Sequence, residues 1–274
     1  MLAVPELHAR FADQLQQGSS ETFLHHYTKL STALEHILGR QELRLGRFAD
    51  TNDPREYRRP RISMVGPRLD PEVSETVVRL ARELLKETWS LVCLTMDAPS
   101  AGAPVTAWDR GWARSRMWAQ YADDHRGVCL VFDRQELMRE LRDQLLVEGA
   151  IMRGPVRYEN TSALNAFVID TRRVDPAHPR FAVIDQMMTH QKQLFLLKSK
   201  DWETEHEYRF LLRRDDRAPY FATVRASLRG VVLGDAVSEA YRPSVDALCH
   251  TLQIGAARIG WDNGTPYLRS LDRR

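Results

Sequence analysis

The chain has 274 residues, 43% of them hydrophobic, enough to bury the core of one large domain or two small ones. Lysine plus arginine number 39 against 37 aspartate plus glutamate, so net charge gives no reason to expect wholesale binding to nucleic acid or an anionic membrane. The three cysteines lie far apart without CxxC spacing, which argues against a disulfide framework or zinc knuckle and fits a reducing compartment. Because no leader pattern or long apolar run is present, we expect a cytoplasmic protein with no membrane partner.

The first half of the chain predicts short strands alternating with helices. An apolar run predicts a strand that passes at once into a helix ended by Gly39. Asp70 followed by proline is typical of a helix start, and this helix is expected to stop near Lys86. The expected elements are a helix over 5–17, a strand over 22–28, a helix over 30–39, a strand over 42–45, a turn segment over 46–54, a helix over 71–86, a buried strand over 89–95, a loop over 97–112 and a helix around 117–121.

The second half continues the alternation without a repeat, a low-complexity segment or a shift in composition. The expected elements are strand 127–132, helix 134–146, strand 151–158, a polar irregular stretch at 160–178, helix 180–197, an acidic strand at 202–212, strands 221–224 and 230–234, helix 237–252 and a final strand around 256–260. No boundary divides this series, so we predict a single mixed α+β domain over residues 1–274.

Two distant segments carry the polar residues of interest. His26 and Thr28 lie where the first predicted strand ends and a helix begins, a junction that anionic ligands favour. In the acidic strand, alternation places Glu205, Glu207 and Arg209 on one outer or cleft-facing side, and His206, Tyr208 and Phe210 on the core side. Taken singly these signals are weak, because a solvated Glu–Arg pair contributes less than about 1 kcal/mol and a strand-end histidine is commonly structural.

Three common site chemistries are missing from the sequence. It has no GxxxxGK[ST] phosphate loop, no GxSxG nucleophile elbow and no HExxH zinc helix. Asn52-Asp53-Pro54 is by itself a typical turn, since Asn and Asp bond their own backbone and proline fixes the next φ. The order of the motifs along the chain is therefore more informative than any one motif.

That order resembles the bacterial domain-of-unknown-function family twenty-nine seventy-one over about residues 22–240. The series is His25-His26-Tyr27-Thr28, Leu34 to Leu38, Leu43-Arg44-Leu45, Asn52-Asp53-Pro54-Arg55-Glu56, Met117-Trp118-Ala119-Gln120-Tyr121, Gly127-Val128-Cys129-Leu130, Val156-Arg157-Tyr158, Lys198, Trp202-Glu203-Thr204-Glu205-His206-Glu207-Tyr208-Arg209 and Val231-Val232-Leu233-Gly234.

More distantly, a strand ending in His-x-Thr and a late strand bearing a glutamate look like the ADP-ribosyltransferase fold. This resemblance implies a central, largely antiparallel sheet, split or continuous, flanked by helices. It also implies that His26 contacts the nicotinamide ribose of NAD, that Thr28 supports this contact, and that Glu207 or Glu205 is the catalytic carboxylate. Cofactor binding is assigned further to Arg44, Arg47, Asn52 and Asp53, with Arg44, Arg47 or Arg55 meeting the phosphates.

The expected function is an NAD-dependent ADP-ribosyltransferase or another NAD-consuming enzyme, acting as a toxin or phage-defence effector on a protein or nucleic-acid acceptor. Two alternatives stay open. One is a non-catalytic nucleotide- or nucleic-acid-binding module, and the other is a metal-dependent hydrolase that uses His26, Asp53, Glu205 and Glu207. The transferase requires His26, Thr28 and Glu207 to line one cleft.

Overall fold

The computed structural model describes residues 2–19, 21–57, 61–98, 105–160, 166–216 and 218–271. The helices are α1 (Val4–Gln17), α2 (Leu30–Thr32), α3 (Pro54–Tyr57), α4 (Pro71–Glu87), α5 (Ser115–Tyr121), α6 (Arg134–Leu145), α7 (Pro179–Thr189), α8 (Gln191–Phe195) and α9 (Arg242–Leu252). A π-helical turn, η1 (Ala33–Leu38), continues α2, and short 3-10 turns include η2 (Phe48–Asp50), η7 (Lys200–Glu205) and η8 (Glu239–Tyr241).

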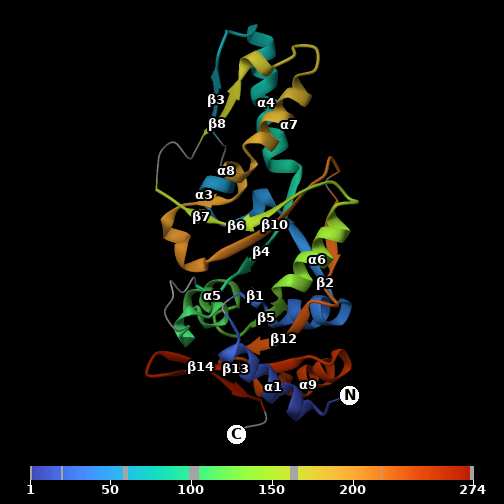
Figure 1. Ribbon diagram of the computed structural model, residues 1–274, viewed down its shortest axis with the longest axis vertical. Helices are drawn as coiled ribbons and strands as arrows, with labels where there is room; N and C mark the ends of the chain where they lie inside the picture. Colours follow the sequence, from blue (N-terminus) through green and yellow to red (C-terminus); the bar gives the residue numbers. More distant parts are fainter. Residues whose placement is uncertain are drawn as a thin grey trace.

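The strands are β1 (Phe23–Thr28), β2 (Glu42–Arg47), β3 (Arg61–Val65), β4 (Trp89–Thr95), β5 (Val128–Asp133), β6 (Ala150–Pro155), β7 (Arg157–Tyr158), β8 (Ala166–Asp170), β9 (Leu197–Lys198), β10 (Glu207–Arg213), β11 (Tyr220–Thr223), β12 (Leu228–Leu233), β13 (Gly255–Asp262) and β14 (Thr265–Ser270). Figure 1 shows an elongated molecule, with β3, β8, α4 and α7 at one end and α1, α9, β13 and β14 at the other.

One large sheet runs through the described residues in the order β11-β2-β4-β1-β5-β12-β13-β14, while β10 pairs with β4 and β6 pairs with β10. Neighbouring strands of this sheet are antiparallel except for β12 and β13, which are parallel. The predicted α+β class with a central, largely antiparallel sheet flanked by helices is therefore confirmed.

The sheet forks at β4. Strand β10 pairs along the whole of one edge of β4, from Glu207 opposite Thr95 to Arg213 opposite Trp89. On the other edge, β2 pairs only near the start of β4 and β1 only at its end, where His25 faces Thr95. The middle of β4 therefore has an edge that neither β1 nor β2 covers, and this opening positions the candidate site.

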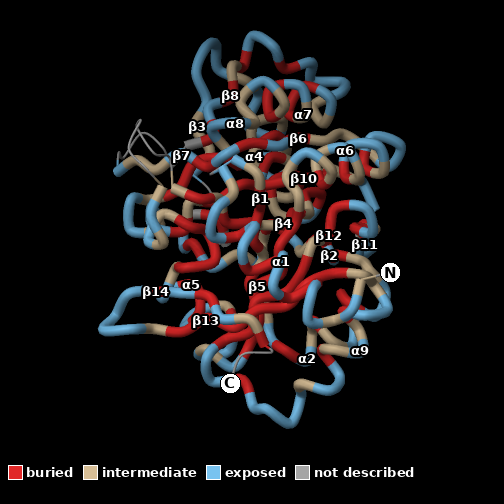
Figure 2. The backbone as a smooth tube through the Cα atoms, turned by 60° about the horizontal axis from the view of Figure 1, so that its bottom comes forward, coloured by how far each residue is buried: buried red, intermediate tan, exposed pale blue. Residues whose placement is uncertain are grey.

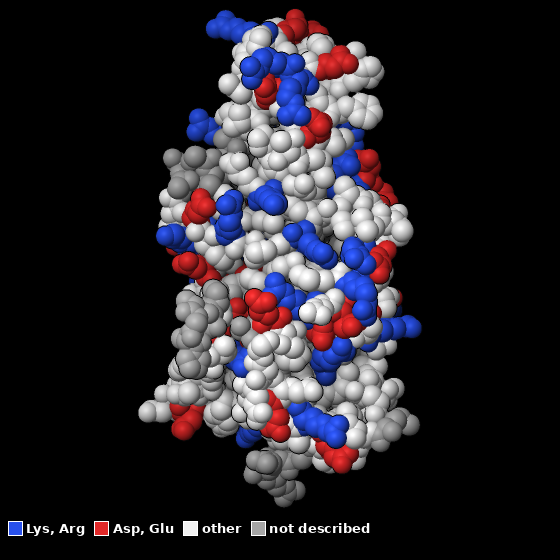
Figure 3. Space-filling view, in the orientation of Figure 1, with Lys and Arg blue, Asp and Glu red and all other residues white. Residues whose placement is uncertain are grey.

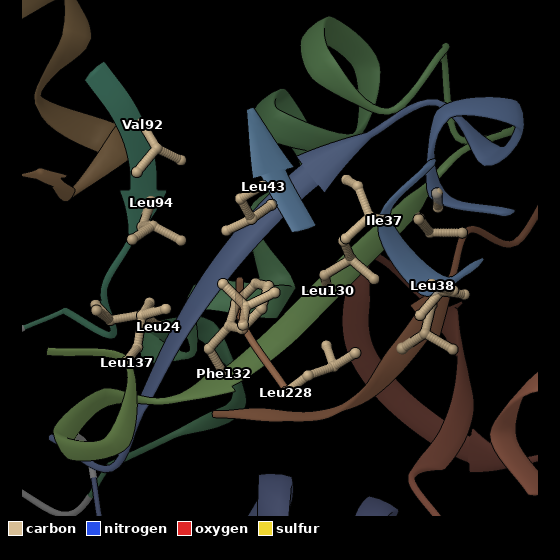
Figure 4. Close-up of a cluster of buried hydrophobic side chains, with 14 of the residues drawn as sticks. Leu24, Ile37, Leu38, Leu43, Val92, Leu94, Leu130, Phe132, Leu137 and Leu228 are labelled. Carbon is tan, nitrogen blue, oxygen red and sulfur yellow. The ribbon is translucent and has the colours of Figure 1, made fainter. Parts of the chain in front are cut away.

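Alternating side chains form cores on both faces of the sheet. One cluster takes Leu24, Leu94 and Phe132 from β1, β4 and β5, whose side chains converge in Figure 4. Tyr27 belongs to a second cluster with the buried Trp118 of α5. Figure 2 shows the buried backbone concentrated along these central strands, with exposure at the ends of the molecule.

Several predicted elements are corrected by the structure. The expected helix over 30–39 widens into the η1 turn after one α-helical turn, and apolar spacing does not separate these two periods. The expected helix over 180–197 is two helices, α7 and α8, joined at His190, whose backbone leaves the helical region. The expected helix over 237–252 begins only at Arg242, after the η8 turn.

Strand predictions also needed correction. The predicted strand 151–158 is divided into β6, which pairs with β10, and β7, which pairs in parallel with β9. Part of the stretch expected to be irregular, 166–170, is strand β8, paired in parallel with the unpredicted β3. The expected final strand is followed by β14, joined through Asn263 and Gly264, both at positive φ.

Candidate functional site

A cavity of about 320 Å³ lies at the fork of the sheet. Strands β1, β2, β4 and β10 contribute to its lining, together with α5 and the segment that follows β2. His26 from the first polar segment and Glu205 and Glu207 from the second all line it. Segments about 180 residues apart in the chain therefore meet at one cavity.

His26 sits in the gap between β1 and β4. Its Nδ1 lies 3.0 Å from the Cys93 carbonyl oxygen, and because a carbonyl only accepts, Nδ1 must carry the proton. Burial lowers the pKa of His26 and outweighs the opposing effect of this bond, so the ring is neutral. The neutral tautomer leaves Nε2 as an acceptor, the role a ligand hydroxyl requires.

Glu205 is held by two donors. The Tyr121 hydroxyl donates to its Oε1 at 2.8 Å, and the Lys198 ammonium donates to its Oε2 at 2.8 Å. Lys198 lies 4.8 Å from the centre of the Trp202 ring, which covers the ammonium group on another side. Because Glu205 and Lys198 are only 3% and 4% exposed, this is a buried ion pair rather than a surface one.

Glu207 is held more tightly. Arg209 donates to both of its oxygens, at 2.7 Å from Nε and 3.1 Å from Nη2, and Lys198 donates to Oε2 at 3.0 Å. Arg209, which is 0% exposed, also donates to Glu56 at 2.5 Å and to the Phe195 carbonyl at 2.7 Å. The three glutamates and two cations form one buried network with a formal charge of −1.

The two carboxylates differ in pKa. Burial would raise the pKa of Glu207, but the charges of Arg209 and Lys198 overcome burial and lower it to about 2. For Glu205, burial raises the pKa, the Lys198 charge opposes this, and the neighbouring Glu207 charge raises it again, leaving a net upward shift. Glu207 therefore stays ionised, whereas Glu205, with its raised pKa, takes up a proton at a higher pH than Glu207 does.

The expected acidic strand over 202–212 is wrong for its first part. Residues 200–205 form η7, begun where the Ser199 hydroxyl accepts from the Asp201 amide at 3.4 Å, and strand pairing starts only at Glu207. Between them His206 is left-handed, with φ 44°, so it does not share the core face of Tyr208 and Phe210. Glu205 therefore reaches Lys198 from a turn, not from a strand face.

The residues assigned to cofactor binding divide into two groups. Arg44, Arg47 and Asn52 line the cavity from its exposed side, whereas Thr28 and the buried Asp53 are not among the lining residues. Arg47 is engaged, because its Nε and Nη2 donate to Asp50 at 2.9 and 2.8 Å. The side chain of Arg55 lies outside the described residues.

Arg44 differs from Arg47 in its partners. Among the described residues Arg44 makes no ion pair. The pKa of Asp50 is lowered mainly by Arg47, against the opposing effect of burial, and the charge of Arg44 lowers it a little further. Its exposed guanidinium at the cavity rim is therefore available to an anion.

The metal-hydrolase alternative lacks its ligand set. Within the described ranges, no group of three His, Cys, Asp or Glu side chains is arranged to hold a metal ion. Asp53 is apart from the cavity, and Glu205 and Glu207 already share the Lys198 ammonium.

Sequence reasoning did not assign roles to several residues of the network. Tyr121 lines the cavity and bonds Glu205, and Glu56 reaches Arg209 from α3. His25, which was assigned no role, also lines the cavity and bonds the Thr95 carbonyl at 3.2 Å. One signal was present: Lys198 is one of few lysines in an arginine-rich chain, seven residues before Glu205.

Residues 117–210 match the model of the protein family described as "Protein of unknown function (DUF2971)". The matched segment contains Tyr121, Lys198, Glu205, Glu207 and Arg209, but not His26 or Arg44. No curated protein and no solved structure matches the chain. No helix in the described part of the chain combines the length and apolar character needed to cross a membrane.

Proposed function

Because the description of the family that residues 117–210 match names no activity, we propose from the cavity itself that the protein is an NAD-consuming enzyme with ADP-ribosyltransferase chemistry. The observation that carries the proposal is the convergence of His26, Glu205 and Glu207 on one cavity of about 320 Å³. Pockets for small molecules and cofactors span roughly 300–1,000 Å³. The cavity therefore suits one half of a dinucleotide, with the rest extending over the rim.

The buried negative charge fits the reaction. Breaking the bond between nicotinamide and ribose leaves positive charge on the ribose carbon in the transition state. A network with a formal charge of −1, fixed in a water-poor cavity, stabilises that charge more than it stabilises neutral ribose. Nicotinamide is a good leaving group, so no strong acid is required.

The roles follow from the contacts. Glu207 is saturated by Arg209 and Lys198, so in the proposal it holds these cations in place and contributes its fixed charge. Glu205 keeps lone pairs beyond its two bonds and is assigned to the developing ribose cation. The Nε2 acceptor of His26 is assigned to a ribose hydroxyl, and Arg44 at the rim to the pyrophosphate.

If the protein is instead a nucleotide-binding module, the same residues contact the nucleotide but no reaction follows. A wide nucleic-acid footprint finds less support, because Figure 3 shows positive and negative side chains interspersed over the face it presents, rather than a basic surface. An enzyme that consumes NAD would serve as a toxin or phage-defence effector by depleting the dinucleotide.

The test is release of nicotinamide from NAD by the purified protein, with and without added protein and RNA. Glu205→Gln is expected to slow release by about 10²- to 10³-fold, the usual effect of removing one preorganised electrostatic group. Glu203→Gln changes an exposed carboxylate of the same turn and is expected to leave the rate unchanged. Saturable NAD binding without nicotinamide release under either condition would instead favour the binding module.

A further inference from the structure

The end of the cavity that holds Glu205 and Glu207 is buried. Among the described residues that line the cavity, the exposed ones belong to a single segment of the chain. Glu205 and Glu207 are 3% and 4% exposed. The exposed lining residues all come from β2 and the segment that joins it to α3; they are Arg44, Arg47, Asp50 and Asn52. A ligand therefore reaches the carboxylates past this rim.

A bound dinucleotide would occupy its own entrance. The proposed function places the nicotinamide ribose beside Glu205 and the pyrophosphate at Arg44, so the rest of the molecule lies across the rim. The other walls are built from buried strand residues and from α5, where Met117 is buried and Tyr121 is bonded to Glu205. A side chain or base of a macromolecule would have to enter along the route that NAD fills.

Resting on the proposed function, we propose that the acceptor is water, so that the protein is an NAD glycohydrolase rather than a modifier of macromolecules. The bond between ribose C1′ and the nicotinamide nitrogen breaks, and both electrons go to the ring, which becomes neutral. A water oxygen forms the new bond to C1′, and its proton passes to a Glu205 oxygen and then to solvent. NAD and water give ADP-ribose, nicotinamide and one proton.

Glu205 is suited to receive that proton. Each of its oxygens accepts one bond, from Tyr121 or from Lys198, which leaves lone pairs on both. Burial and the adjacent Glu207 charge raise the pKa of Glu205, and the Lys198 charge opposes part of this rise, so Glu205 is more basic than an ordinary carboxylate. Glu207, clamped by Arg209, lacks this capacity.

The experiment uses the purified full chain and NAD radiolabelled in the adenylate phosphate, first without any macromolecule. Free ADP-ribose and nicotinamide are expected in a one-to-one ratio, and added protein and RNA are expected to change neither the rate nor the ratio. Methanol at increasing concentration is expected to divert product to the methyl riboside, because a small nucleophile also reaches C1′. Glu205→Gln is expected to lower hydrolysis by about 10²- to 10³-fold, with Glu203→Gln as the unchanged control.

The outcomes separate the two levels of the proposal. Nicotinamide release that requires a macromolecule, with the label retained on it, would overturn water as the acceptor and leave NAD consumption standing. No nicotinamide under any condition would overturn both. Hydrolysis in buffer alone, undiminished in Glu205→Gln, would show that the cavity is not where the water is activated.

Discussion

Replacing Lys198 by methionine tests whether the buried network of ion pairs excludes water. The Lys198 ammonium is shared between Glu205 and Glu207 at 2.8 and 3.0 Å, and all three side chains are at most 5% exposed. Methionine keeps the length of the side chain but removes the charge, and takes the formal charge of the network from −1 to −2. Breaking a buried ion pair by removing one partner costs about 3–5 kcal/mol, and we expect a loss of unfolding free energy in that range at pH 7.

The loss should depend on pH. Without the ammonium that opposes it, the pKa of Glu205, already raised by burial and by Glu207, rises further. A carboxyl whose folded pKa exceeds its unfolded value stabilises the fold below the unfolded pKa and loses this contribution as pH rises through the folded pKa. The destabilisation of Lys198→Met is therefore expected to be larger at pH 7 than at about pH 5. In the wild type Glu207, with a pKa of about 2, loses its own stabilisation only as pH falls below its ordinary value of 4.5.

Urea denaturation followed by tryptophan fluorescence at both pH values measures the effect. Lys200→Met is the matched control, because Lys200 is exposed and only two residues away, and it is expected to change the unfolding free energy little. Wild-type stability of Lys198→Met at pH 7, or an equal loss at both pH values, would refute the reasoning, since it would mean that water solvates the carboxylates.

Three further predictions concern single contacts. His206→Val is expected to have an unfolding free energy about 1–2 kcal/mol lower than that of His206→Asn, and so to melt at a lower temperature, because asparagine tolerates the left-handed backbone and valine does not; equal melting temperatures would contradict this. Tyr121→Phe removes one donor to Glu205 and is expected to cost about 0.5–1.5 kcal/mol in urea denaturation; an unchanged midpoint would mean that the hydroxyl is solvated instead. Arg44→Ala is expected to weaken NAD binding, measured by calorimetry, more than Arg47→Ala, whose arginine is neutralised by Asp50; the opposite order would place the phosphates elsewhere.

Local chemistry explains what was predictable. Asp70 accepts from the Glu72 amide at 2.9 Å and Pro71 begins α4, as the sequence predicts for a helix start. The apolar run from Leu91 to Leu94 in β4 matches a strand buried on both faces. Strand β14 carried a local signal that the predictions did not use, because Asn263-Gly264 at positive φ is the typical two-residue hairpin turn.

Strands with a distant partner were harder to predict. Strands β3 and β8 pair across about 100 residues, and Phe167 and Ile169 alternate into the core from β8. Likewise, part of η7 was expected as a strand because its glutamates alternate with Trp202 and Thr204 and lead into β10, while its conformation depends on a cap at Ser199 and on a salt bridge to Lys198. Pairing partners that lie far along the chain leave little trace in a local pattern.

The sequence by itself determined β1, β2, β4 and α5 around the site and the residue types that meet there, because strand and helix periodicity is a property of neighbouring residues. It also identified His26, Glu205 and Glu207 as residues to examine together. Only the tertiary structure decided that the sheet forks at β4, that Glu205 and Glu207 share one buried ammonium, and that Asp53 and Thr28 lie off the cavity. These depend on which distant strands pair and on where charges lose water, and no local pattern encodes either.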